Sequence, residues 1–381
     1  MNESGASSLS RREIRDRLRL IRSENVGPIT YHRLVERFGG AREALDALPD
    51  LARRGGRAKP VRICPEDEAD RELETLDRLG ARLIALGEPD YPPLLSRIED
   101  APPLLSLVGN AGLLRKAAVA VVGARNASLN GRQLAKQFGA DLGRGGLLVV
   151  SGMARGIDAA AHDGALPTGT VAVLGGGVDV VYPKENADLY RRIAEEGAIV
   201  SEDPPGVQPQ ARHFPKRNRL ISGMSRGAVV VEANARSGSL ITARFAVEQG
   251  REVFAVPGSP LDPRSKGPNG LIRQGATLVE SANDVLEVLK DLFRAPLPEE
   301  RPPLRERFAA GDEATSELDS VRRGILEILG PVAVAVDEVI RSGQFSPAAV
   351  NTVLLELEMA NRVERHPGNR VSLLGRIDGT P

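Results

Sequence analysis

The chain has few residues that can bind a metal ion or form a disulfide. Its 381 residues include one cysteine and four histidines. A single cysteine, Cys64, cannot form a disulfide framework, and the histidines are too scattered to be ligands of one zinc ion. We therefore expect no metal and no other cofactor. The scarcity of cysteine is typical of a reducing compartment, so we expect a cytoplasmic protein.

Large aromatic side chains and long apolar runs are also rare. Tryptophan is absent, and aromatic residues make up 3% of the chain, so aliphatic side chains must form the core. No apolar run approaches the roughly 20 residues that span a bilayer, and the polar N-terminus does not resemble a signal peptide. Because 51 basic residues balance 51 acidic ones, any surface for nucleic acid must be local.

One window of the chain contains no acidic residue at all. Residues 204–231 lack Asp and Glu, yet they include the run Arg212-His213-Phe214-Pro215-Lys216-Arg217-Asn218-Arg219. A local cationic surface favours an anion, and a repeated anion is a phosphodiester. We interpret the run as a basic loop. Its Phe214 could stack on a base of a single strand, or it could equally anchor the loop in the core.

Short apolar runs alternate with amphipathic segments between residues 117 and 290. The predicted strands are 119–122, 147–150, 170–174, 198–201, 228–231 and 252–256, and the predicted helices lie near 131–143, 155–165, 186–196 and 239–249. A further short strand is expected at 83–86. This alternation predicts a Rossmann-like α/β fold, with a doubly wound, mainly parallel sheet and a site at its carboxyl edge.

Smaller segments flank the Rossmann-like domain, which we place at residues 81–292. Residues 8–60 are expected to form a helical module of the SAM or helix-hairpin-helix kind, followed by a linker over 61–80. A flexible linker over 293–317 leads to a winged helix at 318–374. The expected recognition helix of that winged helix carries Glu356 and Glu358. These acidic residues favour a protein-binding or accessory role over binding to duplex DNA.

Gly-rich or hydroxyl-rich loops follow several predicted strands. The loop residues that could contact a phosphate are Gly123, Arg125, Gly152, Lys184, Ser237, Gly238, Ser239 and Thr242. Helix N-termini and backbone nests bind anions, but an arginine paired with an acid and ordinary helix caps would explain the same residues. His162 follows the second of these loops, and we interpret it as a packed helix residue and not a general base.

In combination these motifs resemble the DNA-processing protein A family, also called DprA or Smf. The motifs that carry the resemblance are Val122–Arg125, Ser151–Asp158, His213–Ile221, Ser237–Thr242 and Phe254–Gly258. The resemblance implies a homodimer that binds single-stranded DNA and helps to load the recombinase RecA during natural transformation. Ala124 stands where the family often has serine, so we expect a weaker phosphate contact at that loop.

The resemblance and the basic run together define the expected site. The DNA-binding residues would be the loop residues named above together with Arg212, Phe214, Lys216, Arg217, Asn218 and Arg219. Arg125, Lys184 and the cations of the basic run would form an exposed rim. Leu271, Ile272 and Leu278 are expected in a dimer interface, although they could instead close the core of their own domain.

An enzyme is the main alternative. Nucleoside-monophosphate phosphoribohydrolases have a related sheet and a Pro-Gly-Gly-x-Gly-Thr-x-x-Glu pattern whose glutamate is catalytic. Phe245 stands at the position of that glutamate, and the nearby Glu232 lies at a strand end. Because hydrolysis needs a placed acid or base, we expect no such activity. A duplex-binding regulator built on the winged helix is disfavoured by its acidic recognition helix.

Overall fold

The computed structural model describes residues 9–294 and 315–374, and it divides the chain into two compact units. Residues 72–294 belong to the larger unit, whereas 9–71 and 315–374 belong together in the smaller one. Most of the linker expected at 293–317 lies outside the described residues. Across the described ranges, no helix is long and apolar enough to cross a membrane.

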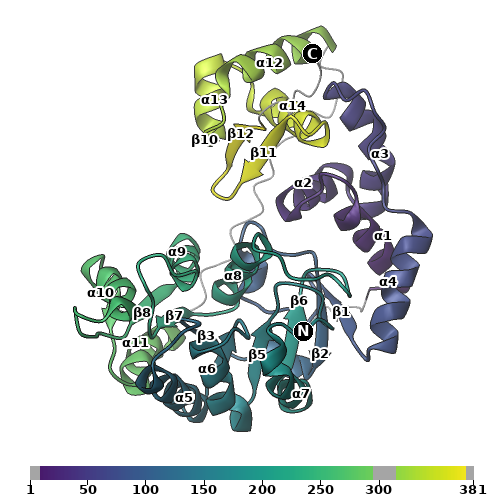
Figure 1. Cartoon of the computed structure of the whole chain (residues 1–381). Helices are drawn as coiled ribbons and strands as arrows, with labels where there is room; N and C mark the ends of the chain where they lie inside the picture. The colour runs from purple at the N-terminus through teal and green to yellow at the C-terminus, as the bar shows by residue number, and fades with distance from the viewer. Residues whose placement is uncertain (1–8, 295–314, 375–381) are drawn as a thin grey trace. The chain divides into compact units, whose positions relative to one another are not determined.

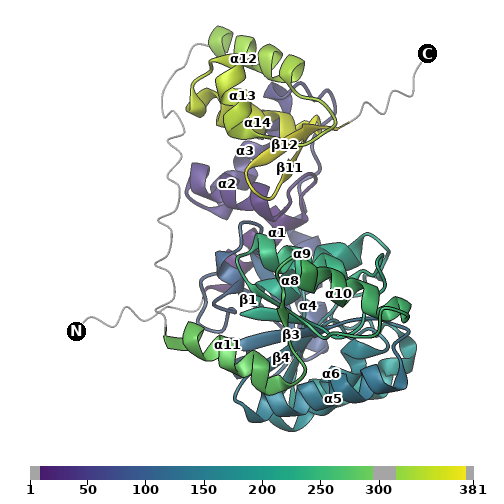
Figure 2. The ribbon, with the colours of Figure 1, turned by 90° about the vertical axis from the view of Figure 1, so that its left-hand side faces the viewer.

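A nine-stranded sheet forms the centre of the larger unit (Figures 1 and 2), and its strand order is β1-β2-β6-β5-β4-β3-β7-β8-β9. The strands are β1 (Arg82–Ala85), β2 (Leu104–Gly109), β3 (Ala118–Val122), β4 (Leu148–Ser151), β5 (Thr170–Val173), β6 (Ala198–Ser201), β7 (Gly227–Val230), β8 (Glu252–Ala255) and β9 (Thr277–Leu278). Strands β3 to β9 pair in parallel, and β1 and β2 add an antiparallel edge. This confirms the predicted doubly wound, mainly parallel sheet, although β2 and β9 were not expected.

The strand order reverses beside β3. The chain passes from β3 through β4, β5 and β6 on one side, and then returns to place β7 against the other side of β3. Ligands of such sheets bind beyond the carboxyl ends of the strands at the point of reversal. In this chain, Val122 and Val230 are paired at that point.

Helices cover both faces of the sheet, because successive residues of each strand point to opposite sides. Val119 and Val121 share a core with α5 (Leu129–Arg144), α6 (Ile157–Ala165) and α11 (Ala282–Arg294). On the same face, α7 (Ala187–Glu196) packs near β5 and β6. Ala120 and Val122 face the opposite core, which holds α8 (His213–Gly223), α9 (Ser239–Glu248) and part of α10 (Lys266–Arg273).

Two segments expected to be irregular are helices. The basic run was interpreted as a loop, which is wrong, because it forms α8 with Leu220 and Ile221 in the core. The linker expected over 61–80 contains α4 (Glu66–Arg78), whose Leu73 and Leu76 are buried. In α4, spaced apolar residues form a buried stripe that the surrounding charges obscure in the sequence. In α8 the buried residues 217–223 are consecutive and mostly polar, so no apolar stripe marks the helix.

The smaller unit combines the N-terminal helices with the winged helix. The N-terminal helices are α1 (Arg11–Arg22), α2 (Pro28–Phe38) and α3 (Ala41–Arg54). The winged helix consists of α12 (Thr315–Ile328), β10 (Val334–Ala335), α13 (Val336–Gly343), α14 (Pro347–Met359), β11 (Val363–His366) and β12 (Arg370–Leu373). Leu355 and Met359 of α14 lie in the same core as Leu34 and Leu48 of the N-terminal helices, so the two segments fold against each other.

Helix α14 is enclosed by protein. Every residue from Ala349 to Met359 is buried, and Thr30 donates a hydrogen bond of 2.6 Å to the Glu358 carboxylate. Arg33 donates to Asn351 and Asn369 from the same side. In a DNA-binding winged helix this helix enters the major groove. Here it contacts the N-terminal helices of the same chain instead, so the protein-binding or accessory role expected from its acidic residues stays a prediction.

Candidate nucleic-acid interface

Two aromatic rings and a guanidinium lie together beyond the carboxyl ends of the strands. The Tyr182 and Phe214 ring centres are 5.6 Å apart, and the planes are inclined by 38°. The Arg125 guanidinium lies 4.9 Å from the centre of the Phe214 ring. Tyr182 is 46% exposed, and Arg125 is exposed as well. We call Arg125, Tyr182 and Phe214 the ring site.

Tyr182 was missed in the sequence, although one signal for it was present. The chain has only four tyrosines and eight phenylalanines, and Tyr182 stands in a loop that follows β5 at the carboxyl edge. An exposed ring at that edge is uncommon in a protein so poor in aromatics. The sequence allows two roles for Phe214, a platform for base stacking or an anchor in the core. In the structure its side chain is partly exposed on the first turn of α8.

Arg217 supports the ring site from inside the protein. Its side chain is buried, and its Nη1 donates to the carbonyl oxygens of Gly152 and Val173, at 2.5 Å each. These bonds tie α8 to the carboxyl ends of β4 and β5. A larger residue at 152 would displace this guanidinium, because a Cβ there would lie 2.2 Å from the Arg217 Nη1. The Arg217 guanidinium also lies 6.0 Å from the Phe214 ring centre.

The carboxylate of Asp158 occupies the backbone nest that was expected to face DNA. The Ala154 amide donates to it at 3.4 Å. Burial raises the pKa of Asp158 to about 6, while the charge of Arg217 and the backbone amides of Ala154, Gly123 and Gly152 act to lower it. Burial likewise lowers the pKa of Arg217 to about 10. The amides after β3 and β4 therefore face an internal anion.

A second internal carboxylate occupies the N-terminus of α5. Glu232 accepts hydrogen bonds from the backbone amide of Ser128 at 2.8 Å and from its hydroxyl at 2.5 Å. The backbone oxygen of Glu232 accepts from the Ala124 amide at 2.6 Å. We expected amides at this edge to bind a phosphate, but the Ser128 and Ala124 amides already donate to protein groups. Ala124 is itself buried, so its side chain lies away from solvent.

The expected cationic rim is only partly exposed. Arg219 is buried and pairs with Glu202 and Asp100, so neither Arg217 nor Arg219 lies on a rim. Lys216 is half exposed, with its Nζ 3.6 Å from the Glu202 carboxylate. The remaining expected cations are exposed, and they are Arg125, Lys184 and Arg212.

The hydroxyl-rich loop after β7 is joined to α8. Asn218 is buried and donates to the Gly238 carbonyl at 3.1 Å, which orders the loop against the basic helix. The Ser237 and Ser239 hydroxyls lie 2.8 Å apart. Ser239 and Thr242 are buried on the first turns of α9, so only Ser237 and Gly238 of this group can be reached from solvent.

His162 is a packing residue, as expected. Its ring is fully buried on α6, and its Nδ1 lies 2.8 Å from the Thr170 hydroxyl. Burial lowers its pKa to about 3, so the ring is neutral at physiological pH. A neutral imidazole sealed from solvent cannot exchange protons with a substrate.

The residues expected in a dimer interface lie at one edge of the sheet. Leu278 is 48% exposed on β9, the last strand of the sheet. Leu271 and Ile272 on α10 are partly buried, and Leu271 packs against the core of its own domain. Of these residues, Leu278 leaves the most apolar surface open.

Comparison with known proteins identifies the family. The family model of DNA recombination-mediator protein A matches residues 82–290, which span the whole sheet and the ring site. The chain belongs to this family. The DprA-like N-terminal HHH domain matches residues 11–75, and the DprA winged helix domain matches 309–369. The DprA resemblance seen in the motifs is confirmed.

Several DprA relatives are similar over much of their length. Protein Smf of Escherichia coli is 40% identical over 314 residues, covering 81% of this chain and 82% of the relative. DNA processing protein DprA of Streptococcus pneumoniae is 50% identical over 198 residues, or 51% of this chain and 70% of the relative.

Two solved DprA structures share the fold. The X-ray structure of the Streptococcus pneumoniae protein aligns with a TM-score of 0.63 at 38% identity, covering 74% of this chain and 98% of that one. A structure of the Helicobacter pylori protein, described as giving insight into its single-stranded DNA binding mode, aligns with a TM-score of 0.51 at 28% identity. It covers 55% of this chain and 96% of that one.

Proposed function

We propose that this protein binds single-stranded DNA at the ring site, with little preference for sequence. The observation that carries the proposal is the pair of rings, Tyr182 exposed and Phe214 partly exposed, with a guanidinium 4.9 Å from the Phe214 ring centre, beside the strand reversal. Every base has a π face, so stacking on such rings tolerates any sequence. Bases inside a duplex are already stacked and cannot use the site without being unpaired.

In this proposal the phosphates are held by side chains and not by backbone nests. Asp158 and Glu232 already occupy the amides at the carboxyl edge. The exposed cations Arg125, Lys184 and Arg212 remain for the strand. Binding should therefore weaken steeply with salt, as expected when phosphates are neutralised by mobile cationic side chains. The single-stranded DNA binding mode described for the Helicobacter pylori relative supports the same class of ligand.

The proposal predicts that Phe214→Leu weakens binding to oligothymidylate, because a stacked base contributes about 1–3 kcal/mol. Phe245→Leu is a matched control, since Phe245 is also a partly exposed helix residue with an arginine, Arg244, 5.4 Å from its ring centre. Fluorescence anisotropy at fixed salt would compare single strands with duplexes of equal length. Tighter binding to the duplex, or equal losses in the two variants, would contradict the proposal.

We propose further that the protein acts as a homodimer that delivers the strand to the recombinase RecA. Leu278, exposed on the edge strand β9, supports a contact between two copies. Leu278→Asp should convert a dimer to a monomer in light scattering at micromolar concentration, because a charge opposes burial of that edge. A wild-type protein that is itself monomeric in this measurement would contradict the proposed dimer. If the protein does not stimulate RecA assembly on single-stranded DNA, the proposed delivery role is wrong.

We propose a DNA-binding mediator and not a nucleotide hydrolase. Phe245 stands where the related hydrolases place their acid, and Glu232 is held by the N-terminus of α5. We therefore expect no release of free base from nucleoside monophosphates above a no-protein control, measured by chromatography. Release that disappears in Glu232→Gln would favour the hydrolase instead.

A further inference from the structure

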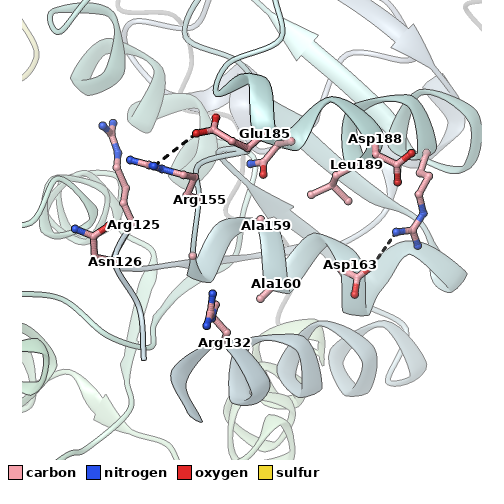
Figure 3. A pocket seen from close by; sticks show the side chains of 13 residues that line it. Arg125, Asn126, Arg132, Arg155, Ala159, Ala160, Asp163, Glu185, Asp188 and Leu189 are labelled. Atoms are coloured by element: carbon pink, nitrogen blue, oxygen red, sulfur yellow. Dashed lines mark hydrogen bonds and ion pairs between the residues drawn. The ribbon is translucent and has the colours of Figure 1, made fainter. Parts of the chain in front are cut away.

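A hollow of about 530 Å³ opens beside the ring site (Figure 3). Gly156, Ala159 and Ala160 line it along α6, while α5 and α7 contribute residues on either side. Larger side chains at those small positions would fill the space. We call this hollow the α6 groove. Arg125 belongs to both the groove and the ring site, so the two are continuous.

The groove has cations that can accept a phosphate. Arg125 and Arg132 line it and have no acidic partner within the described residues. Arg155 is 3.7 Å from Glu185, in an ion pair whose side chains are 56% and 65% exposed. Such exposed pairs contribute at most about 1 kcal/mol, so Arg155 can exchange its partner for a phosphate at little cost.

Acidic side chains in the groove only partly oppose an anion. Asp163 is held between Lys136 at 2.6 Å and Arg192 at 2.9 Å, so its charge is compensated. Asp188 lies on α7 with its side chain 73% exposed, and its partner is Arg191. The uncompensated charge therefore lies near Arg125 and Arg132, on the side of the groove next to the ring site.

We propose that the α6 groove is a second subsite for the bound strand. It takes the nucleotide next to the one stacked at the ring site, with the linking phosphate between Arg125 and Arg132. Cavities that hold small organic ligands measure about 300–1,000 Å³, so this volume suits a single nucleotide unit. The inference rests on the proposed function, because the strand must already occupy the ring site.

The test uses charge changes of opposite sign within the groove. Arg132→Ala should weaken binding of long oligothymidylates about threefold to tenfold and reduce the salt slope by about 0.7, the value for one phosphate on a single strand. Asp188→Asn should strengthen binding about twofold to threefold, because it removes an opposing charge. With oligonucleotides too short to extend beyond the ring site, both variants should match the wild type.

Arg144→Ala is the matched control. Arg144 is also an exposed arginine of α5, with its side chain 71% exposed, but it lies 12 residues after Arg132. At 1.5 Å per residue it is about 18 Å away along the helix, so its removal should leave affinity and salt slope unchanged. Ala159→Leu adds an independent test, because it fills the groove without changing any charge and should weaken only the longer oligonucleotides.

The outcomes separate this inference from the proposed function. If Arg132→Ala and Asp188→Asn behave as the wild type at every length while Phe214→Leu still weakens binding, the subsite is wrong and the ring site stands. If Phe214→Leu and Arg125→Ala also have no effect, the proposed function fails. Calorimetric binding of free thymidine monophosphate that is lost in Arg132→Ala, with no dependence of oligonucleotide binding on length, would make the groove a mononucleotide site and overturn the subsite.

Discussion

Arg125→Ala should lower the affinity for oligothymidylate by roughly tenfold to a hundredfold. This range corresponds to the loss of a charge-assisted phosphate contact worth about 1.5–3 kcal/mol. Arg125 is exposed and has no acidic partner among the described residues. Its position 4.9 Å from the Phe214 ring centre places the charge beside the base that would stack there. One side chain would then contact both the phosphate and the aromatic platform.

A salt titration distinguishes this role from a structural one. Loss of one phosphate contact should reduce the slope of log K against log salt by about 0.7. The melting temperature should stay close to that of the wild type, because removal of an exposed side chain usually changes stability by less than about 0.5 kcal/mol. A lower melting temperature with an unchanged slope would indicate a structural arginine.

Arg244→Ala serves as the control for Arg125→Ala. Arg244 is also exposed and lies 5.4 Å from a phenylalanine ring centre, that of Phe245 on α9. Unlike Arg125 it has an acidic partner, Glu248 at 3.5 Å, but it shares the exposed guanidinium beside a phenylalanine ring. Its removal should leave the affinity and the salt slope unchanged. An unchanged affinity in a normally folded Arg125→Ala protein would move the DNA site away from the carboxyl edge.

The sheet could be predicted because parallel strands are buried on both faces. Such strands read as continuous apolar runs, and Ala118–Val122 is a clear example with all of its residues buried. The loops that follow the strands then reach one edge by topology alone. For this reason the sequence placed Arg125, Gly152 and Lys184 near one another without any knowledge of contacts.

The burial of the basic run could not be predicted from local pattern. A buried arginine and a solvated one look alike in sequence, and only their partners distinguish them. The partners of Arg217 and Arg219 are Gly152, Val173, Glu202 and Asp100, which lie 17 to 119 residues away. Helix α8 was therefore mistaken for an exposed loop.

For the same reason, the sequence did not reveal that protein carboxylates already occupy the backbone amides at the carboxyl edge. Asp158 and Glu232 are ordinary acidic residues in the sequence, and nothing nearby shows that their carboxylates face the amides at the carboxyl edge. Glu232 caps a helix whose Ser128 lies 104 residues earlier. The motif was interpreted as an anion site, and its amides do face anions, but those anions belong to the protein.

Arg217→Met should cause a large loss of stability, although it removes a cation from a basic run. The side chain is buried, and it bonds the carbonyls of Gly152 and Val173 beside the buried carboxylate of Asp158. The two groups act on each other through space, since the charge of Arg217 lowers the pKa of Asp158. Removing a buried charge that compensates another costs about 3–5 kcal/mol, because the other charge stays buried without compensation. For a domain of this size we expect the melting temperature to fall by roughly 6–20 °C. Lys216→Met, the half-exposed neighbour on α8, should melt close to the wild type.

The loss of stability in Arg217→Met should be smaller at low pH. Burial raises the pKa of Asp158 to about 6 from an ordinary value of 3.8, and the charge of Arg217 acts to lower it. Without Arg217 the folded-state pKa must rise further. Between the unfolded and folded pKa values the folded protein holds a proton that the unfolded chain has released, so stability falls as pH rises. Lowering the pH from 8 to 5 should therefore raise the melting temperature of Arg217→Met more than that of the wild type.

The double variant Arg217→Met/Asp158→Asn isolates the electrostatic coupling between these two buried groups. It should regain part of the lost stability and lose the extra pH dependence, because no buried charge is left uncompensated. Thermal melts of the wild type, both single variants and the double variant at pH 5 and pH 8 form the complete cycle. If the melting temperature changes with pH by the same amount in all four proteins, the pair does not hold α8 in place. If the pair does hold it, Arg217→Met should also weaken single-strand binding under conditions where it is folded, because Phe214 depends on α8 for its position.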